Sequence, residues 1–360
     1  MKKILFYINT LGKGGAERVI KNLSEQFASD GFESILVTSF CCNQEYRVSK
    51  NVKRIALYDK RLKGLIFRNF KLISKLKKII KNENPDVVIS FMGESNFRAI
   101  LATKKTNAKC IVSIRNDPEK EYQGLVSRFL AKTLYKRADG IVFQTEDAKK
   151  WFPPSIQQKS KIIINQVDSI FFNTFYNGER KNIVSVGRLT EQKNHELLIR
   201  AFSLVSSQTD DNLIIYGNGP LRQRLLTLIR ELRLEGRVML PGIIDNVSET
   251  IKSAKAFVLS SNYEGMPNAL MEALALGLPC ISTDCPCGGP RKIIENNSNG
   301  LLVPNNDLDS LAGAIIKVLK NKDLQSQFIS KSKIAAENMF SPSLVFKSWK
   351  LYVTEVCHRG

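Results

Sequence analysis

The 360-residue sequence has no apolar run approaching the roughly 18 residues that a membrane-spanning helix needs. Its first apolar stretch, residues 4–8, ends before Asn9 and is too short for the hydrophobic region of a signal peptide. Aromatic residues make up only 8% of the chain and are not interleaved with basic residues as in nucleic-acid-binding modules. We therefore expect a cytoplasmic protein without a nucleic-acid partner, which meets a membrane only at its surface if at all.

Cysteine and histidine are too few and too irregularly spaced for a disulfide framework or a metal site. The seven cysteines are odd in number and several lie in apolar runs, which indicates a reducing compartment. Cys285 and Cys287 flank one proline, unlike a zinc knuckle, and only His195 and His358 are there to complete a site. We interpret these cysteines as loop residues, expect His195 to cap a helix start, and expect no metal.

Acidic residues are scarce, and the imbalance is greatest in the first half of the chain. The sequence has 54 Lys and Arg against 34 Asp and Glu, a net charge of +20. Residues 1–170 hold 32 basic and 16 acidic residues, a net +16, whereas residues 171–360 hold 22 and 18, a net +4. Such a field favours an anionic partner of the first half: membrane headgroups, a phosphorylated substrate or nucleic acid.

Short β-rich runs alternate with helical patterns, and the alternation restarts after residue 170. The runs expected as strands are 4–8, 34–38, 87–91, 110–114, 140–144, 161–165, 182–187, 212–216, 238–240, 256–260 and 279–283. Helical patterns are clearest at 16–29 and 67–81. This order indicates parallel sheets in two α/β domains, residues 1–170 and 171–340. A last helix within 341–360 starts at a Ser-Pro pair and is expected to pack back towards the first domain.

A glycine-rich turn follows the first expected strand. Gly12, Gly14 and Gly15 would let a ligand approach the backbone at the start of the next helix, which suits an anion. Glu17 occupies the third glycine position of a dinucleotide fingerprint, and the phosphate-loop motif is absent. The turn therefore argues against NAD and ATP, although an ordinary tight turn remains an alternative.

Two further constellations follow strands of the second half. Arg188 and Lys193 lie in one loop, where both could grip a phosphate, or where both could simply be solvated. Glu264 precedes a helix expected at 267–276, and Glu272 lies inside that otherwise apolar helix. A buried carboxylate needs a partner, which the hydroxyls of a ribose or sugar would supply. A cap-region glutamate and one surface glutamate are the alternative.

These residues stand in the pattern S-S-x-Y-E-G-M-P-x-x-x-x-E-A-L-A-x-G-x-P at residues 260–279, which resembles the signature of glycosyltransferase family 4. Four other segments resemble motifs of that family, in the same order along the chain: 14–18, 186–194, 216–220 and 299–304. The resemblance implies an α/β protein of the GT-B fold, in which two Rossmann-like domains face a central cleft. It also implies a retaining enzyme that uses a nucleoside diphosphate sugar.

Carried over position by position, the resemblance assigns catalytic roles to Glu264, Arg188 and Lys193. Arg188 and Lys193 would contact the diphosphate, Glu272 the ribose and Glu264 the transferred sugar. The implied donor site also includes Gly14, Gly15, Gly217, Gly265, Asn268, Ala269 and Leu270. Two cations and a helix N-terminus can stabilise the leaving diphosphate without a metal. The one Asp-x-Asp motif, Asp307–Asp309, is expected to cap a helix near Ser310 instead.

The sequence departs from the family in one place. Many members have a histidine near the donor sugar after the fourth or fifth strand, whereas residues 111–118 contain none. Arg115 takes that place, or Asp117 contacts the sugar or acceptor instead. Polar loop residues beside a proline turn are the alternative for both.

Residues 60–81 contain nine basic residues and no acidic one, with apolar residues near helical spacing. The segment suits a helix on an anionic bilayer, or a domain helix with a solvated basic face, and both can hold at once. We expect a peripheral enzyme on the inner face of the cell membrane. It would move a hexosyl or N-acetylhexosaminyl group from a UDP-sugar to a glycan acceptor, linked to polyprenyl diphosphate, in cell-surface polysaccharide or oligosaccharide synthesis. The alternatives are a basic nucleic-acid- or membrane-binding protein without catalysis, and a NAD-dependent oxidoreductase.

Overall fold

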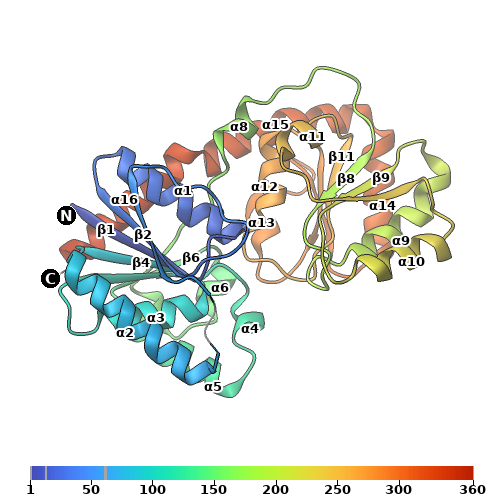
Figure 1. Ribbon diagram of the computed structural model, residues 1–360. Helices are drawn as coiled ribbons and strands as arrows, with labels where there is room; N and C mark the ends of the chain where they lie inside the picture. The colour runs from blue at the N-terminus through green and yellow to red at the C-terminus, as the bar shows by residue number, and fades with distance from the viewer. Residues whose placement is uncertain (1, 13, 61–62, 360) are drawn as a thin grey trace. The chain divides into compact units, whose positions relative to one another are not determined.

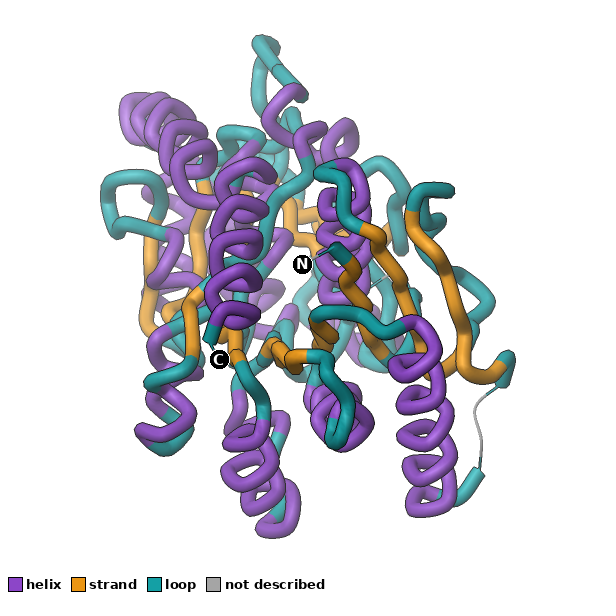
Figure 2. Tube along the Cα trace, turned by 90° about the vertical axis from the view of Figure 1, so that its left-hand side faces the viewer, coloured by secondary structure: helices purple, strands orange, loops and turns teal. Residues whose placement is uncertain are grey.

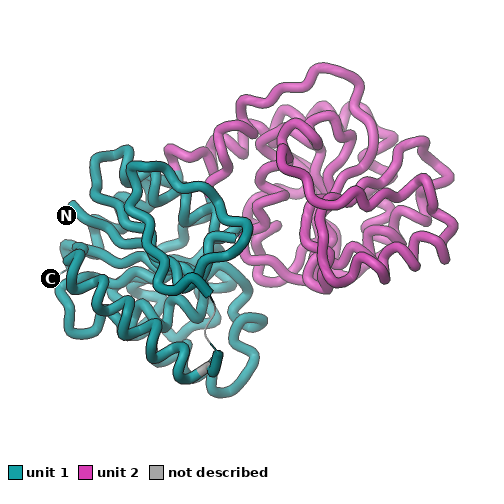
Figure 3. Tube along the Cα trace, in the orientation of Figure 1, with its two compact units in different colours: residues 1–165, 345–360 teal, residues 166–344 magenta. Residues whose placement is uncertain are grey.

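The computed structural model describes residues 2–12, 14–60 and 63–359. The chain forms two compact units: unit 1 comprises Met1–Asn165 and Val345–Gly360, and unit 2 comprises Gln166–Leu344 (Figure 3). The boundary between the first segment of unit 1 and unit 2 therefore falls after residue 165, whereas the sequence predicted a domain boundary after residue 170. The end of the chain belongs to unit 1 and is not a separate part.

Unit 1 is a seven-stranded sheet in the order β3-β2-β1-β4-β5-β6-β7, and all its neighbouring strands are parallel. The strands are β1 Lys3–Ile8, β2 Glu33–Phe40, β3 Val52–Tyr58, β4 Val87–Phe91, β5 Lys109–Ser113, β6 Gly140–Phe143 and β7 Ser160–Ile162. The helices are α1 Gly15–Ser29, α2 Leu65–Glu83, α3 Gly93–Thr103, α4 Pro118–Glu121, α5 Leu125–Leu134, η1 Tyr135–Arg137, α6 Glu146–Lys150, α7 Pro154–Gln157 and most of α16 Pro342–His358. Figure 1 shows α1 and α16 above the sheet, and α2 and α3 below it.

The central strands of unit 1 are apolar along their whole length because helices cover both faces of the sheet. All five residues of β4 are buried, as are the last five of β1. β3, by contrast, is an edge strand with Lys53 and Arg54 near its start, and the sequence analysis did not predict it. Charged residues are common on edge strands, where one side of the strand faces water, and they hide the apolar signal.

The carboxyl-terminal helix α16 packs on unit 1. Tyr352 Oη accepts a hydrogen bond from Ile141 N at 2.8 Å and donates one to Lys159 O at 2.6 Å. The Trp349 ring stacks on Phe91, with 5.8 Å between the ring centroids. These buried contacts join the end of the chain to β4, β6 and the start of β7.

Unit 2 is a six-stranded parallel sheet in the order β10-β9-β8-β11-β12-β13. Its strands are β8 Ile183–Val186, β9 Leu213–Tyr216, β10 Val238–Gly242, β11 Ala256–Leu259, β12 Cys280–Asp284 and β13 Leu301–Pro304. Its helices are α8 Ser169–Asn173, α9 His195–Val205, η2 Ser206–Gln208, α10 Arg222–Glu231, α11 Val247–Ile251, α12 Asn268–Ala275, α13 Gly289–Ile293, α14 Leu308–Lys320 and α15 Lys322–Phe340. In Figure 2 helices, in purple, flank the orange strands.

The strand order fixes where a ligand can bind in each unit. Both sheets reverse their winding at one point, between β1 and β4 in unit 1 and between β8 and β11 in unit 2. In open parallel sheets the loops that leave the carboxyl ends of such strands diverge and form the ligand-binding crevice. Among the helices of the described residues, none is both long and apolar enough to cross a membrane.

Candidate active site

The loops that leave β8 and β11 carry the candidate site of unit 2. β8 and β11 are adjacent parallel strands, so their carboxyl ends lie side by side although about 70 residues separate them in sequence. The loop after β9 joins them through Gly217, whose φ is +141° and whose Cβ, if present, would lie 1.9 Å from Gly187 O. Only glycine fits there, which gives the predicted donor residue Gly217 a structural reason.

Asn262 ties the β11 loop to the β8 loop. Its backbone N donates to Gln192 O at 2.8 Å, and its side-chain amide donates to Glu191 O at 2.7 Å. Ser260 adds a third link, since its hydroxyl donates to Lys193 O at 3.0 Å. The backbone of Lys193 is therefore fixed before any ligand arrives.

Lys193 and Glu264 form an ion pair, with 2.5 Å between Nζ and Oε1, and both side chains are largely buried at 15% and 7% exposure. Ser261 donates its hydroxyl to the same oxygen, Oε1, at 2.6 Å. Thr283 in turn donates to Ser261 O at 2.7 Å. Within the described chain Oε2 has no partner and is not sealed from solvent, so one carboxylate oxygen is anchored and the other is available to a ligand.

The Cys285–Gly289 segment holds the backbone of Glu264 and Gly265. Glu264 N donates to Pro286 O at 2.7 Å, and Cys287 N donates to Glu264 O at 3.2 Å. A Cβ on Gly289 would lie 1.9 Å from Gly265 O, so the backbone segments at these two glycines are in direct contact. Burial, with the nearby Glu264 charge, raises the pKa of the Cys285 thiol to about 12 and keeps it protonated. The described His, Cys, Asp and Glu side chains form no group of three suited to a metal ion.

The other predicted site residues of unit 2 differ in exposure and in hydrogen bonding. Arg188 is exposed, and its guanidinium makes no hydrogen bond or ion pair with any described residue; its backbone carbonyl accepts from Thr190 N at 2.9 Å. Glu272 lies in the second turn of α12 and is only 4% exposed. Leu270 N donates to Pro267 O at 3.1 Å, and Asn268 and Ala269 begin α12. Contact of these three residues with the donor stays a prediction.

His195 opens α9 but does not cap it, contrary to our expectation. The cap is Asn194, whose side chain accepts from Leu197 N at 3.3 Å. His195 is buried, and burial together with the Lys193 charge lowers its pKa to about 3. The imidazole is therefore neutral at physiological pH. The expected cap by Asp307 is confirmed, because its Oδ1 accepts from Ser310 N at 2.9 Å at the start of α14.

In unit 1, Gly14 caps α1 and Gly15 begins it. A Cβ on Gly14 would lie 2.3 Å from a carboxylate oxygen at the end of the flexible Glu17 side chain, and the backbone at Gly14 is extended with φ −104°, so the turn does not require glycine at residue 14. The turn follows β1, at the edge where the winding reverses. Lys13, inside the same motif, lies outside the described residues.

Arg115 and Asp117 follow β5 and are built into the fold of unit 1. The Arg115 guanidinium lies 3.8 Å from the Phe91 ring centroid and donates to Asn165 Oδ1 at 2.6 Å. Burial lowers its pKa to about 9. Asp117 caps α4 by accepting from Glu119 N at 3.0 Å, and burial raises its pKa. These contacts favour the structural alternative for both residues, and contact with a sugar stays a prediction.

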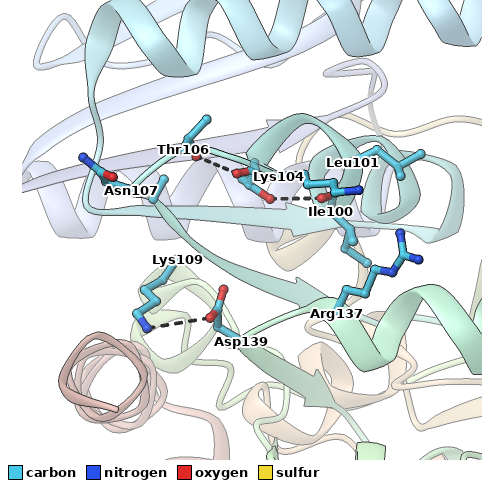
Figure 4. A pocket seen from close by; sticks show the side chains of 10 residues that line it. Ile100, Leu101, Lys104, Thr106, Asn107, Lys109, Arg137 and Asp139 are labelled. Carbon is cyan, nitrogen blue, oxygen red and sulfur yellow. Dashed lines mark hydrogen bonds and ion pairs between the residues drawn. The ribbon is translucent and has the colours of Figure 1, made fainter. Parts of the chain in front are cut away.

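Unit 1 also has a pocket of about 290 Å³ at the amino ends of β5 and β6 (Figure 4). Lys104, Lys109, Arg137 and Asp139 contribute to its wall, and Lys109 Nζ lies 3.8 Å from Asp139 Oδ1. It lies at the opposite edge of the sheet from the glycine-rich turn. The pocket is therefore separate from the residues that the sequence singled out.

Comparison with known proteins agrees with this geometry. Residues 13–169 match the family model described as Glycosyltransferase Family 4, and residues 166–334 match the model described as Glycosyl transferases group 1. An uncharacterized glycosyltransferase of Methanocaldococcus jannaschii is 32% identical, over 84% of this chain and 88% of its own. The N-acetylgalactosamine-N,N'-diacetylbacillosaminyl-diphospho-undecaprenol 4-alpha-N-acetylgalactosaminyltransferase of Campylobacter jejuni is 30% identical, over 94% of this chain and 95% of its own.

Solved structures support the fold. Sucrose-phosphate synthase of Thermosynechococcus elongatus superimposes with a TM-score of 0.85 at 18% identity and covers 99% of both chains. Anabaena HepE in complex with UDP and glucose gives 0.82 at 15% identity, over 99% of this chain and 100% of its own. The protein is thus a sugar-transferring enzyme of the GT-B fold. The chain belongs to glycosyltransferase family 4.

Ser261 and Asn262 belong to the site, although their residue types alone do not assign them to it. Ser261 and Asn262 stand in the quoted motif, but no role was assigned to them. Their polar side chains directly follow a buried strand, a position that in a parallel sheet faces the ligand edge. That position was the available clue to both.

Proposed function

We propose that this glycosyltransferase moves a hexosyl or N-acetylhexosaminyl group from a UDP-sugar to a lipid-linked glycan, with retention of anomeric configuration and without a metal. The observation that carries the proposal is the anchored Glu264, with Oε1 bound to Lys193 and Ser261 and Oε2 available to a ligand. The names of two Campylobacter relatives, which specify undecaprenol-linked acceptors, support the acceptor class. The UDP and UDP-glucose complexes of HepE support the donor class.

In the proposed reaction the anomeric C–O bond breaks, negative charge grows on the leaving UDP, and positive charge grows on the sugar. Arg188 and Lys193 would neutralise the diphosphate, because both follow β8 at the ligand edge. Glu264 Oε2 would hold a hydroxyl of the sugar, and Glu272 would accept from the ribose. The acceptor hydroxyl attacks the same face, and its proton passes to the departing diphosphate.

Family membership decides against a NAD-dependent oxidoreductase and against a binding protein without catalysis. An acceptor on polyprenyl diphosphate would place the enzyme at the inner face of the cell membrane. The basic segment 60–81 supports this, although Arg61 and Leu62 lie outside the described residues. Its charge attracts the anionic headgroups among which such an acceptor lies.

The deciding experiment is a donor screen by released nucleotide, with UDP- and GDP-sugars and a vesicle-embedded polyprenyl-diphosphate glycan. We expect release with one UDP-sugar only, retained activity in EDTA, and an α-linked product by NMR if the donor is α-linked. The matched variant is Glu264→Gln, which keeps the size of the side chain and lowers turnover at least tenfold. Full activity of that variant, or loss of activity in EDTA, would contradict the corresponding part of the proposal.

A further inference from the structure

Unit 1 exposes two groups of large apolar side chains at the starts of α2 and α5. On α2 these are Ile66, Phe67 and Phe70, with Ile66 86% exposed, and on α5 they are Leu125, Val126 and Phe129, with Leu125 87% exposed. Contiguous exposed apolar groups of this size on a folded protein mark interaction surfaces. We name these six residues the apolar tips.

The apolar stripe of α2 divides into two parts. Leu72, Leu76 and Ile80 are buried against unit 1, as expected for a domain helix. Ile66, Phe67 and Phe70, in the first two turns, are not covered. The two interpretations of residues 60–81 therefore apply to different turns of the same helix.

Both tips lie at one edge of the sheet. α2 follows β3, and α5 leads back to β6, so each helix begins near the carboxyl ends of the strands. α3 packs against both α2 and α5, so the three helices are neighbours (Figure 1). The glycine-rich turn after β1 lies at the same edge. A surface that binds the tips would thus also face the ligand edge of unit 1.

The charges around the tips are positive. α2 contains six basic residues and one acidic residue, Glu83, and residues 122–138 contain four basic residues and no acidic one. Lys71 Nζ lies 4.1 Å from the ring centroid of Phe67. Lys75 and Lys77, further along α2, donate to the backbone carbonyls of Leu57 and Lys104. Lys71 is therefore the lysine that lies beside an exposed ring of the α2 tip.

Arg68 lies between Phe67 and Phe70 in sequence, but on the covered side of α2, and its Nε has no partner among the described residues. It is only 8% exposed, and its Nε is buried without a hydrogen bond to any residue that the structure describes. Its terminal nitrogens keep access to solvent and likewise make no bond within the described chain. An unpaired guanidinium is suited to a phosphate, which it can bind through two parallel hydrogen bonds.

We propose that the two apolar tips are one docking surface for a bilayer of anionic phospholipids, in which Arg68 and Lys71 bind lipid phosphates. Apolar side chains flanked by cations match a bilayer interface, where acyl chains lie beneath anionic headgroups. A second copy of this chain would bring like charges together. The inference rests on the proposed lipid-linked acceptor, whose diphosphate lies at the level of the headgroups.

The test uses the full chain and sedimentation with two kinds of vesicle, pure phosphatidylcholine and the same lipid with 30% phosphatidylglycerol. Leu125→Ser/Phe129→Ser changes no charge and removes the α5 tip, and Arg68→Gln removes the guanidinium. We expect binding to anionic vesicles to fall at least tenfold in the first variant and severalfold in the second. Leu351→Ser is the matched control, because Leu351 is 63% exposed on α16, and its binding should equal wild type.

Unchanged binding of the α5 variant, or equal binding of wild type to both vesicles, overturns the proposal. So does a dimer of the wild type that the α5 variant converts to a monomer with vesicle binding intact, since the occupant is then a second copy. Turnover on a short-chain acceptor in solution separates this proposal from the proposed function. If sugar transfer is intact but vesicle binding is unchanged by substitutions in the tips, only the docking proposal is wrong. If vesicle binding depends on the tips but no sugar is transferred, only the proposed function is wrong.

Discussion

The ligand edges of the two units are built in opposite ways. In unit 2 the charged residues are bound to one another before a ligand arrives, as in the contacts of Lys193 and Ser261 with Glu264. In unit 1 the same edge exposes apolar rings and leaves Arg68 unpaired. The difference fits two partners. Prearranged charges in unit 2 suit a small, highly charged donor, and accessible apolar area in unit 1 suits an extended amphipathic surface.

The sharpest test of this contrast is Lys193→Ala. The change removes a prearranged cation, which typically lowers turnover by about 10²- to 10³-fold. It also leaves the largely buried Glu264 carboxylate with Ser261 alone, at a cost of about 1–3 kcal/mol of stability. Initial rates and urea denaturation measure the two effects. The control is Lys252→Ala, which breaks an ion pair with Glu249 and should change neither turnover nor stability. If the turnover of Lys193→Ala stayed within twofold of wild type, the prearranged pair would have no part in the mechanism.

Arg188→Ala separates catalysis from stability. Because the exposed guanidinium of Arg188 makes no hydrogen bond or ion pair with the described protein, its removal should leave the unfolding midpoint unchanged. We expect kcat/KM to fall at least tenfold, because the diphosphate loses a cation. Arg230→Ala, an exposed arginine on α10, serves as control for the loss of one positive charge. A loss of stability without a loss of kcat/KM would contradict the assignment.

Ser261→Ala tests whether the position of Glu264 depends on its second hydrogen bond. We expect turnover to fall about three- to tenfold, in keeping with about 1 kcal/mol for one net hydrogen bond. Ser261→Thr keeps the hydroxyl and should restore most of the rate, which a merely structural role would not predict. Ser282→Ala, which removes another buried hydroxyl on β12, is the matched control.

The last prediction concerns stability alone, through His195, and has no expected effect on turnover at neutral pH. Its folded pKa of about 3 lies below the unfolded value of about 6.5, so the unfolded chain binds the extra proton first. Stability should therefore fall as the pH drops from about 6.5 towards 3, by at most about 1.4 kcal/mol per pH unit from this residue. Denaturation of wild type and His195→Gln at pH 7, 6 and 5 measures the difference. Parallel pH profiles would show that the imidazole is not held neutral.

Much of the fold and part of the site follow from the residues alone. The alternation of strands and helices, the order of the motifs and the helix starts at Asn268 and Pro342 depend on local chemistry, which the sequence displays directly. β3 was missed because an edge strand carries charges, and α5 was missed because a ten-residue helix with one exposed face resembles a loop-flanked apolar run. The structural task of Arg115 depends on Phe91 and Asn165, which are distant in sequence, whereas Asp117 caps α4 through Glu119, two residues away.

The amino-acid sequence by itself determined which charged residues stand in the loop after each strand, since spacing and residue type are local. Tertiary structure alone decided that β8 and β11 are neighbours, and so brought Lys193 and Glu264, 71 residues apart, to 2.5 Å. It also decided which turns of α2 are covered and where α16 returns. The physical reason is that parallel strands pair through long crossovers, so adjacency and burial depend on how whole layers pack and not on the segment itself.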